Sequence, residues 1–407
     1  MTTVIRAQGP RELLAYVPYR LGYRPRDSVV LVGLRPPRGR VGLVVRVDVA
    51  DLADLEHGPQ VARSVVGHLA ADGAQRVVLV AYTDAPLRTG YTDAPLRTGG
   101  DGVARARAAV EHCREAVEPH VGPVEAWVVS STGWYALDCA EDDCCPPAGR
   151  PLRDLESSEV GAHMVLAGTA LADSREDALR IPRAGAEARR RAARAARRAH
   201  ERAARAAQAG EDPVDDRVRA LALWRAAVAL AAGPGRRGAE EAPPAEGPGR
   251  PGRAPREALA PKVPAAPVLG RLAAALGSVP VRDAVLVSLV PGTGDLADRT
   301  VRGADVDSGT GRAIAAIVDP AAGRAPDPSV TGPTRAVLEA VVAHAPRGSA
   351  APALALLALL AWWHGDGGRA VRRVEEALAE DPAHRLARLL ASALDAGVPP
   401  GWVRADV

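Results

Sequence analysis

The sequence contains no phenylalanine and only 3% aromatic residues, so its core has to be built mainly from alanine, valine and leucine. Lysine occurs once, as Lys262 in a proline-rich stretch, which argues against mechanisms that need a buried lysine and against a P-loop. Four cysteines in 407 residues are too few for a disulfide scaffold. With 47% hydrophobic and 25% charged residues, the chain has the composition of an ordinary soluble globular protein.

Long apolar segments are also missing. The first residues lack the apolar core of a signal peptide. The longest apolar run, residues 350–363, is shorter than the roughly 20 residues that a membrane-spanning helix requires. We therefore expect no membrane association and a cytoplasmic, reducing location. The net charge of +3 is too small to indicate nucleic acid by itself.

Four short apolar runs predict strands in the first part of the chain, at residues 28–34, 41–49, 76–82 and 124–130. The first two form a β-hairpin. Helical patterns follow the second and third strands, and such alternation favours parallel pairing with right-handed crossovers. We predict an α/β domain over residues 1–172, with a mostly parallel sheet and flanking helices.

The topology of this sheet predicts the position of a ligand site. Ligands of wound α/β sheets bind beyond the carboxyl ends of the parallel strands. The polar residues at these ends are Asp48, Thr83, Asp84, Ser130 and Ser131. The sequence has no G-x-S-x-G elbow and no H-E-x-x-H pair, so no catalytic residue is assigned.

Three of the four cysteines follow the last strand, as Cys139, Cys144 and Cys145. They could bind zinc, with Cys113 or His163 as a fourth ligand, although adjacent cysteines are awkward around one ion and no C-x-x-C pair is present. Cys139 could instead form a redox pair with either neighbour, which the cytosol disfavours. The third alternative is a loop with small buried cysteines.

The next segment, residues 173–232, is predicted to be helical. Nine arginines lie between Arg183 and Arg205, where the only apolar residue is alanine. This composition predicts a long solvated helix, or a helix that grips an acidic protein partner. Nucleic acid is less expected, since no aromatic residues are interspersed for base stacking. Residues 233–267 carry nine prolines and six glycines and predict a flexible linker.

Residues 268–407 are predicted to form an α-helical domain. Apolar residues between Leu354 and Ala377 have the spacing of one tetratricopeptide-like helical hairpin, which cannot bury its faces alone. Trp362 and Trp363 are expected to anchor it. Elsewhere, the nonapeptide that begins at Tyr82 is repeated exactly once and ends at Gly99; we interpret it as an insertion in a loop.

Several motifs resemble an actinobacterial family catalogued as domain of unknown function 4192. They are residues 13–25 (LLAYVPYRLGYRP), the spacing of Trp134, Cys139 and residues 144–149 (CCPPAG), and residues 360–367 (LAWWHGDG). The resemblance covers most of the chain. It implies kinship but supplies no activity and no catalytic residues.

Three functions follow from these observations. We favour a non-enzymatic cytoplasmic binding or interaction protein, because of the helical end, the arginine-rich helix and the missing catalytic motifs. The alternative is an enzyme or small-ligand sensor with its site at the carboxyl edge of the sheet. A further alternative is a metal-based or thiol redox role of the cysteines. No cofactor is assigned, with zinc kept as an alternative.

Overall fold

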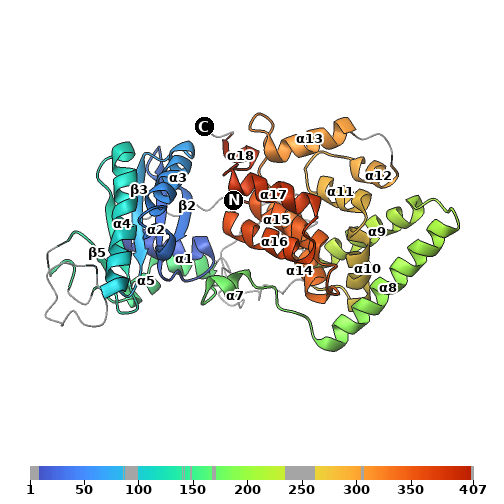
Figure 1. The fold of residues 1–407 in the computed structure, drawn as a ribbon, viewed down its shortest axis with the longest axis horizontal. Coiled ribbons are helices and arrows are strands. Elements are labelled where there is room, and N and C mark those ends of the chain that lie inside the picture. The colour runs from blue at the N-terminus through green and yellow to red at the C-terminus, as the bar shows by residue number, and fades with distance from the viewer. Residues whose placement is uncertain are drawn as a thin grey trace, which may run out of the picture. The chain divides into compact units, whose positions relative to one another are not determined.

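The computed structural model describes residues 9–85, 87, 100–139, 141, 143–146, 149–166, 171–233, 262–303 and 307–404. Contacts within the chain separate two units, Met1–Arg180 and Ile181–Asp406 (Figure 1). The predicted linker falls mostly on residues 234–261, and the second copy of the nonapeptide on residues 91–99, which both lie outside the described residues. The division into four parts stays a prediction.

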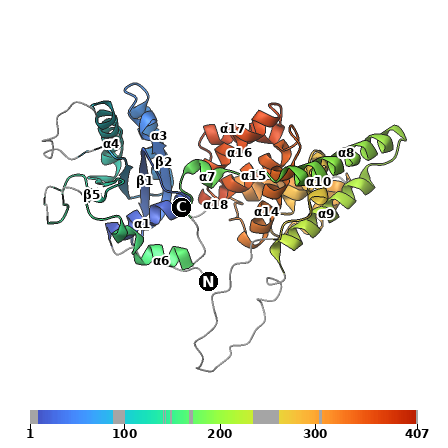
Figure 2. The ribbon, with the colours of Figure 1, turned by 90° about the horizontal axis from the view of Figure 1, so that it is seen from below.

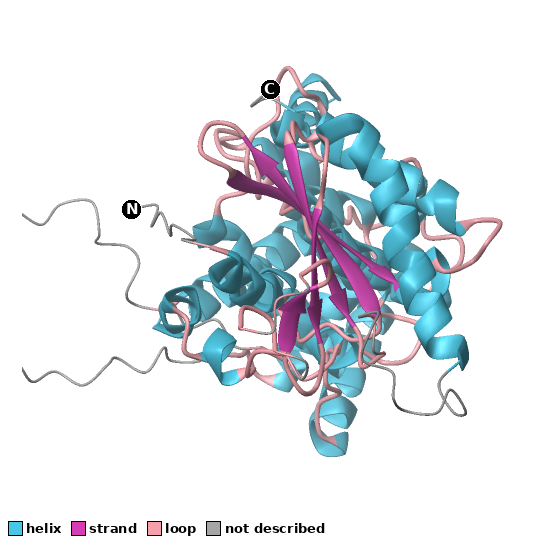
Figure 3. Ribbon diagram, turned by 90° about the vertical axis from the view of Figure 1, so that its left-hand side faces the viewer, coloured by secondary structure: helices cyan, strands magenta, loops and turns pink. Residues whose placement is uncertain are grey.

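The first unit contains one five-stranded sheet in the order β2-β1-β3-β4-β5 (Figure 3). The strands are β1 (Ser28–Arg35), β2 (Arg40–Asp48), β3 (Arg76–Tyr82), β4 (Glu125–Val129) and β5 (Trp134–Ala136). β1 is antiparallel to both of its neighbours, and β4 is antiparallel to β5. Only β3 and β4 pair in parallel.

The prediction of a mostly parallel sheet is therefore wrong. After the β1–β2 hairpin, the chain crosses over and adds β3 to the free edge of β1, not to β2. The strands β2, β3 and β4 still run in the same direction, because β1 is antiparallel to both β2 and β3. Ser28 of β1 pairs with Asp48 on one side and with Tyr82 on the other. The start of β1 and the carboxyl ends of β2 and β3 therefore lie at the same end of the sheet.

Helices cover both faces of this sheet (Figure 2). The helices of the first unit are α1 (Pro10–Leu21), α2 (Val49–Leu52), α3 (Gly58–Ala71), α4 (Gly100–Val121), α5 (Arg153–Glu156), α6 (Glu159–Leu166) and α7 (Arg175–Leu179). Side chains alternate between faces along a strand. Val29 and Leu31 accordingly pack with α3 and α4, whereas Val30 and Val32 pack with α1.

The second unit is helical throughout its described residues. Its helices are α8 (Ala186–Gln208), α9 (Val214–Ala232), α10 (Ala266–Leu276), α11 (Val279–Val287), α12 (Leu296–Val301), α13 (Asp307–Val318), α14 (Pro328–His344), α15 (Ala351–Trp363), α16 (Gly367–Glu380), α17 (Arg385–Asp395) and α18 (Gly401–Arg404). α15 is buried along almost its whole length and packs against α16. Its likeness to a tetratricopeptide repeat stays a prediction.

Tryptophans fix α15 within this unit. The indole N–H of Trp363 donates to the carbonyl of Arg324 at 2.8 Å, and that of Trp362 donates to the carbonyl of Val398 at 2.9 Å. Trp402 donates in turn to the carbonyl of Trp363 at 2.7 Å. The predicted anchoring role of Trp362 and Trp363 is confirmed. None of the described helices is both long and apolar enough to cross a membrane.

Candidate functional site

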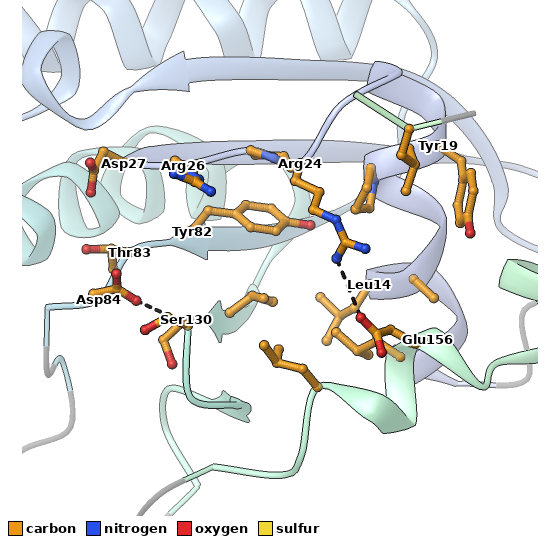
Figure 4. Close-up of a pocket in the computed structure, with 18 residues that line it drawn as sticks. Leu14, Tyr19, Arg24, Arg26, Asp27, Tyr82, Thr83, Asp84, Ser130 and Glu156 are labelled. Atoms are coloured by element: carbon orange, nitrogen blue, oxygen red, sulfur yellow. Dashed lines mark hydrogen bonds and ion pairs between the residues drawn. The ribbon is translucent and has the colours of Figure 1, made fainter. Parts of the chain in front are cut away.

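A pocket of about 560 Å³ opens at the edge of the sheet where β3 and β4 end (Figure 4). Tyr82 and Val129, the last residues of these strands, are paired in register and both line it. The loops that follow add Thr83, Asp84, Ser130 and Ser131. Apolar lining comes from α1 and from the segment that includes α5, for example Leu14 and Leu155.

Four of the five residues predicted from topology are thus brought together around one cavity. Asp48 does not line it. Its carboxylate instead contacts the guanidinium of Arg46, with a shortest N–O distance of 2.6 Å. The reason is the position of β1, which separates β2 from β3 and leaves Asp48 two strands away from Tyr82.

Asp84 links the two loops at the pocket. Its Oδ1 accepts a hydrogen bond of 2.6 Å from the backbone N–H of Ser131. This bond, with a smaller contribution from the positive charge of Arg26, holds the pKa of the Asp84 carboxyl below its ordinary value. The group is therefore a carboxylate at neutral pH, with its remaining lone pairs available to a ligand.

Tyr82 lines the pocket and carries a buried hydroxyl. The residue is 5% exposed, and its hydroxyl has no hydrogen-bond partner within the part of the chain that the structure describes. Figure 4 shows the ring lying across the cavity with the hydroxyl directed toward Arg24. Burial raises the pKa of the phenol, so it remains protonated. The hydroxyl of Ser28, the cross-strand neighbour of Tyr82, is also buried and lacks a described partner.

Topology alone missed the charged residues that precede β1. Arg24, Arg26 and Asp27 line the pocket, because an antiparallel strand starts at the edge where its neighbour ends. Arg24 forms an ion pair of 3.7 Å with Glu156 of α5. Asp27 has a φ of 41°, a left-handed conformation that Asp tolerates better than most residues. The R-P-R-D sequence before an apolar run was the available signal.

The three cysteines of the loop after β5 lie together. The sulfurs of Cys139, Cys144 and Cys145 are all within 4.8 Å of one another. Cys145 is buried, the other two are partly exposed, and no disulfide joins them. Arg150 donates from Nη2 to the sulfur of Cys144 at 3.5 Å, and its guanidinium lies 5.1 Å from the ring centre of Trp134.

The thiols of this group differ in their acidity. Hydrogen bonding to the backbone of Glu141 lowers the pKa of Cys139, whereas burial raises that of Cys145. Neither residue considered as a fourth ligand joins the described cluster. Cys113 lies on α4 in the core of the first unit, where burial raises the pKa of its thiol to about 12. His163 is exposed on α6.

The arginine-rich segment forms α8 in the second unit. Its alanines Ala192, Ala195 and Ala196 are buried, whereas most of its arginines are exposed. α8 lies alongside α10 (Figure 2), where Gly270 allows the backbones to touch. The alanine face thus packs inward, and the positive charge faces solvent.

Comparison with known proteins identifies the family of this chain. Residues 10–401 match the sequence model described as Domain of unknown function (DUF4192). No curated protein and no solved structure matches the chain. The actinobacterial source stays a prediction. Since the match covers nearly the whole chain and includes both units, the protein belongs to the domain of unknown function 4192 family.

Proposed function

We propose that the first unit binds a small organic molecule in the pocket at the end of β3 and β4. The hydroxyl of Tyr82 carries this proposal. It is buried and unpartnered among the described residues, and Tyr82 itself lines a cavity of about 560 Å³. Buried polar groups in folded proteins normally have partners, and ligand sites are cavities of this size with a few convergent polar groups.

The lining favours a neutral or zwitterionic ligand with an apolar part. Two arginines and three carboxylates line the pocket: Arg24, Arg26, Asp27, Asp84 and Glu156. Their formal charges sum to −1, so a polyphosphate would meet repulsion. Leu14, Val129 and Leu155 offer apolar surface beside these charges. A ligand with both donors and acceptors at one end satisfies this mixed lining.

The same groups support binding more than catalysis. A general base works best when its pKa lies near the working pH. The pKa of Asp84 is lowered by its bond from Ser131, and that of Tyr82 is raised by burial, so both move away from neutrality. Fixed protonation states suit hydrogen bonding to a ligand. An enzyme at this edge of the sheet therefore remains the second choice.

Equilibrium dialysis against a cell extract, followed by mass spectrometry, tests the proposal. Ser131 is exposed at the rim of the pocket, so Ser131→Trp obstructs the cavity without altering the backbone N–H that Asp84 accepts. Thr132 is also exposed but does not line the pocket, which makes Thr132→Trp the matched control.

We expect the wild-type protein and Thr132→Trp to retain the same neutral or zwitterionic compounds, and Ser131→Trp to lose them. Retention of the same compounds by Ser131→Trp would place binding elsewhere. Absence of any retained compound in the wild type would contradict the proposed function.

A second candidate concerns α8 in the other unit. Packing of its alanine face against α10 leaves an exposed band of arginines, of which Arg191 has Glu187 as an intrahelical partner at 3.6 Å. We infer that this band binds an acidic protein segment. The probe is a glutamate-rich peptide, whose affinity should fall with salt and with the double variant Arg194→Gln and Arg198→Gln.

Its matched control is the double variant Arg347→Gln and Arg388→Gln, at two other exposed arginines of the same unit. Equal peptide binding by all three proteins would exclude α8. Preferential binding of a nucleic acid of equal charge would contradict the acidic-protein assignment.

A further inference from the structure

The loop that follows β5 brings the sulfurs of three cysteines close together. A tetrahedral zinc ion has Zn–S bonds of about 2.3 Å, which corresponds to sulfur–sulfur separations of about 3.8 Å. The sulfurs of Cys139, Cys144 and Cys145 are within 4.8 Å of one another without a disulfide. A contraction of about 1 Å, within the reach of side-chain rotation, brings them to the geometry of one ion.

Local hydrogen bonds explain how adjacent cysteines reach the same point. The backbone N–H of Cys139 donates to the carbonyl of Ala136 at 3.3 Å, which turns the chain after β5. The N–H of Cys145 donates to the carbonyl of Glu141 at 2.8 Å, which forms a turn of helical type. Successive side chains of such a turn project about 100° apart, so both can lean toward Cys139.

Arg150 pairs with Trp134 at the base of the loop and places its guanidinium beside Cys144. The backbones of Trp134 and Arg150 exchange two hydrogen bonds, of 2.9 and 2.8 Å. The Nε of Arg150 donates to the carbonyl of Cys144 at 2.7 Å, and its Nη2 lies 3.5 Å from the sulfur of the same residue. Partners that hydrogen-bond to metal ligands orient them and stabilise their charge.

We propose that Cys139, Cys144 and Cys145 bind one Zn²⁺ as thiolates, with Arg150 as the positioning residue for Cys144. Binding forms three Zn–S bonds and releases three thiol protons to solvent, without any oxidation or reduction. Three protein ligands leave a fourth position for water or an external ligand. The partial exposure of Cys139 and Cys144 gives the ion access.

Titration of the reduced full-length protein with Co²⁺ provides the first test, because cobalt reports thiolate ligation through its charge-transfer absorption. We expect one Co²⁺ per chain, displaced by Zn²⁺. The single variants Cys139→Ser, Cys144→Ser and Cys145→Ser should each lose this absorption. Arg150→Met should weaken binding by about 10-fold, as expected when a partner of a ligand is removed.

Cys113→Ala is the matched control, since Cys113 is the one cysteine outside the cluster. Its Co²⁺ affinity should equal that of the wild type. No charge-transfer absorption in the wild type, or equal absorption in the triple serine variant, would overturn the proposal.

Alkylation of the wild-type protein gives a second readout that does not depend on the folding of any variant. Zn²⁺ should slow the reaction of iodoacetamide with Cys139 and Cys144, measured peptide by peptide. Unchanged rates at both residues would contradict zinc binding. This site shares no ligand with the pocket at Tyr82, so the failure of either proposal leaves the other standing.

Discussion

Tyr82 combines a structural and a functional role in one side chain. Its ring packs in the core between the sheet and α1, while its hydroxyl is buried without a described partner. An unsatisfied buried hydroxyl destabilises the folded state, because it has lost its hydrogen bonds to water. A ligand that hydrogen-bonds to this group would recover part of that cost.

Replacement of this hydroxyl should therefore separate stability from binding. We predict that Tyr82→Phe leaves the free energy of unfolding unchanged or raises it by up to about 1 kcal/mol. Its affinity for the retained compound should fall. Urea denaturation measures the first effect and calorimetry the second. A loss of stability well beyond 1 kcal/mol would show that the hydroxyl already has a structural partner.

A second residue, Asp72, fixes the helix-to-strand geometry of the first unit. Its carboxylate lies at the end of α3 and accepts hydrogen bonds from Arg35 Nε at 2.8 Å and from the backbone of Leu43 at 2.7 Å. It thus joins α3 to β1 and β2. Gly42 leaves room for it, because an added Cβ would lie 2.4 Å from the carboxylate.

We predict that Asp72→Ala lowers the free energy of unfolding by about 2 kcal/mol, because the hydrogen bonds from Arg35 and Leu43 lose their buried acceptor. Asp51→Ala, at an exposed carboxylate on α2, should change it by less than about 0.5 kcal/mol. Urea denaturation of both variants gives the comparison. Equal stability of the two variants would show that the Asp72 network contributes nothing.

At the level of single residues, part of the pocket could be predicted from the sequence. Thr83, Asp84, Ser130 and Ser131 follow directly from strand ends, a rule that needs only strand directions. The contribution of Arg26 could not be predicted in the same way, because it depends on β1 lying next to β3. The partnerless state of the Tyr82 hydroxyl depends on packing that no local pattern encodes.

Among the elements, the contact between α8 and α10 depends on a single glycine. A Cβ added at Gly270 would lie 2.0 Å from the carbonyl oxygen of Ala192, so the two helix backbones are in direct contact. Such a distance cannot be relieved by a side-chain rotation, because the backbone of residue 270 fixes the position of the Cβ and the oxygen belongs to the backbone of Ala192.

Gly270→Ala should therefore push α8 away from α10 and lower the free energy of unfolding by about 1–3 kcal/mol. Gly332→Ala is the matched control, because Gly332 lies inside α14 with nothing within 4 Å of an added Cβ. That variant should be neutral or stabilising by up to about 1 kcal/mol. Thermal unfolding compares the two, and a stable Gly270→Ala would refute the close contact.

His384, at the start of α17, is expected to make the stability of the second unit depend on pH. His384 caps this helix by accepting a hydrogen bond from the backbone of Ala387, and it is buried. Burial, followed by the positive charge of Arg282, lowers its pKa, although Asp381 opposes this effect. The unfolded chain therefore binds a proton at His384 more readily than the folded protein does.

The contribution of His384 to the free energy of unfolding should then be fully present above the ordinary histidine pKa of about 6.5. It should decrease as the pH falls toward the lower pKa of the folded protein. We predict that the free energy of unfolding decreases between pH 7.5 and 5.5. His384→Asn keeps a capping side chain and should reduce this slope. An unchanged slope would mean that other groups, such as His364, whose pKa is also lowered by burial, account for it.

Element types were easier to predict than their arrangement. The apolar runs identified β1 to β4 because buried strands are rich in valine and leucine. Their order could not be deduced, since β3 could add to either edge of the β1–β2 hairpin without changing any local pattern. Pairing with β1 instead of β2 made the sheet mostly antiparallel.

The whole molecule consists of two units with separate cores. The sheet of the first unit is packed on both faces, and the second unit is organised around α15. The low aromatic content was informative at this scale, because it predicted cores of alanine, valine and leucine with a few tryptophans and tyrosines as anchors. Family membership rests on a match that spans both units, yet no motif of the sequence specifies a ligand. That information has to come from the pocket itself.

The central claim is that the pocket beside Tyr82 binds a small neutral or zwitterionic molecule. Its most direct test is the dissociation constant of the retained compound, measured by calorimetry for three proteins. We predict equal values for the wild type and Thr132→Trp, and a value at least about 10-fold higher for Ser131→Trp, which corresponds to about 1.4 kcal/mol of binding free energy. Equal affinities in all three proteins would contradict the account.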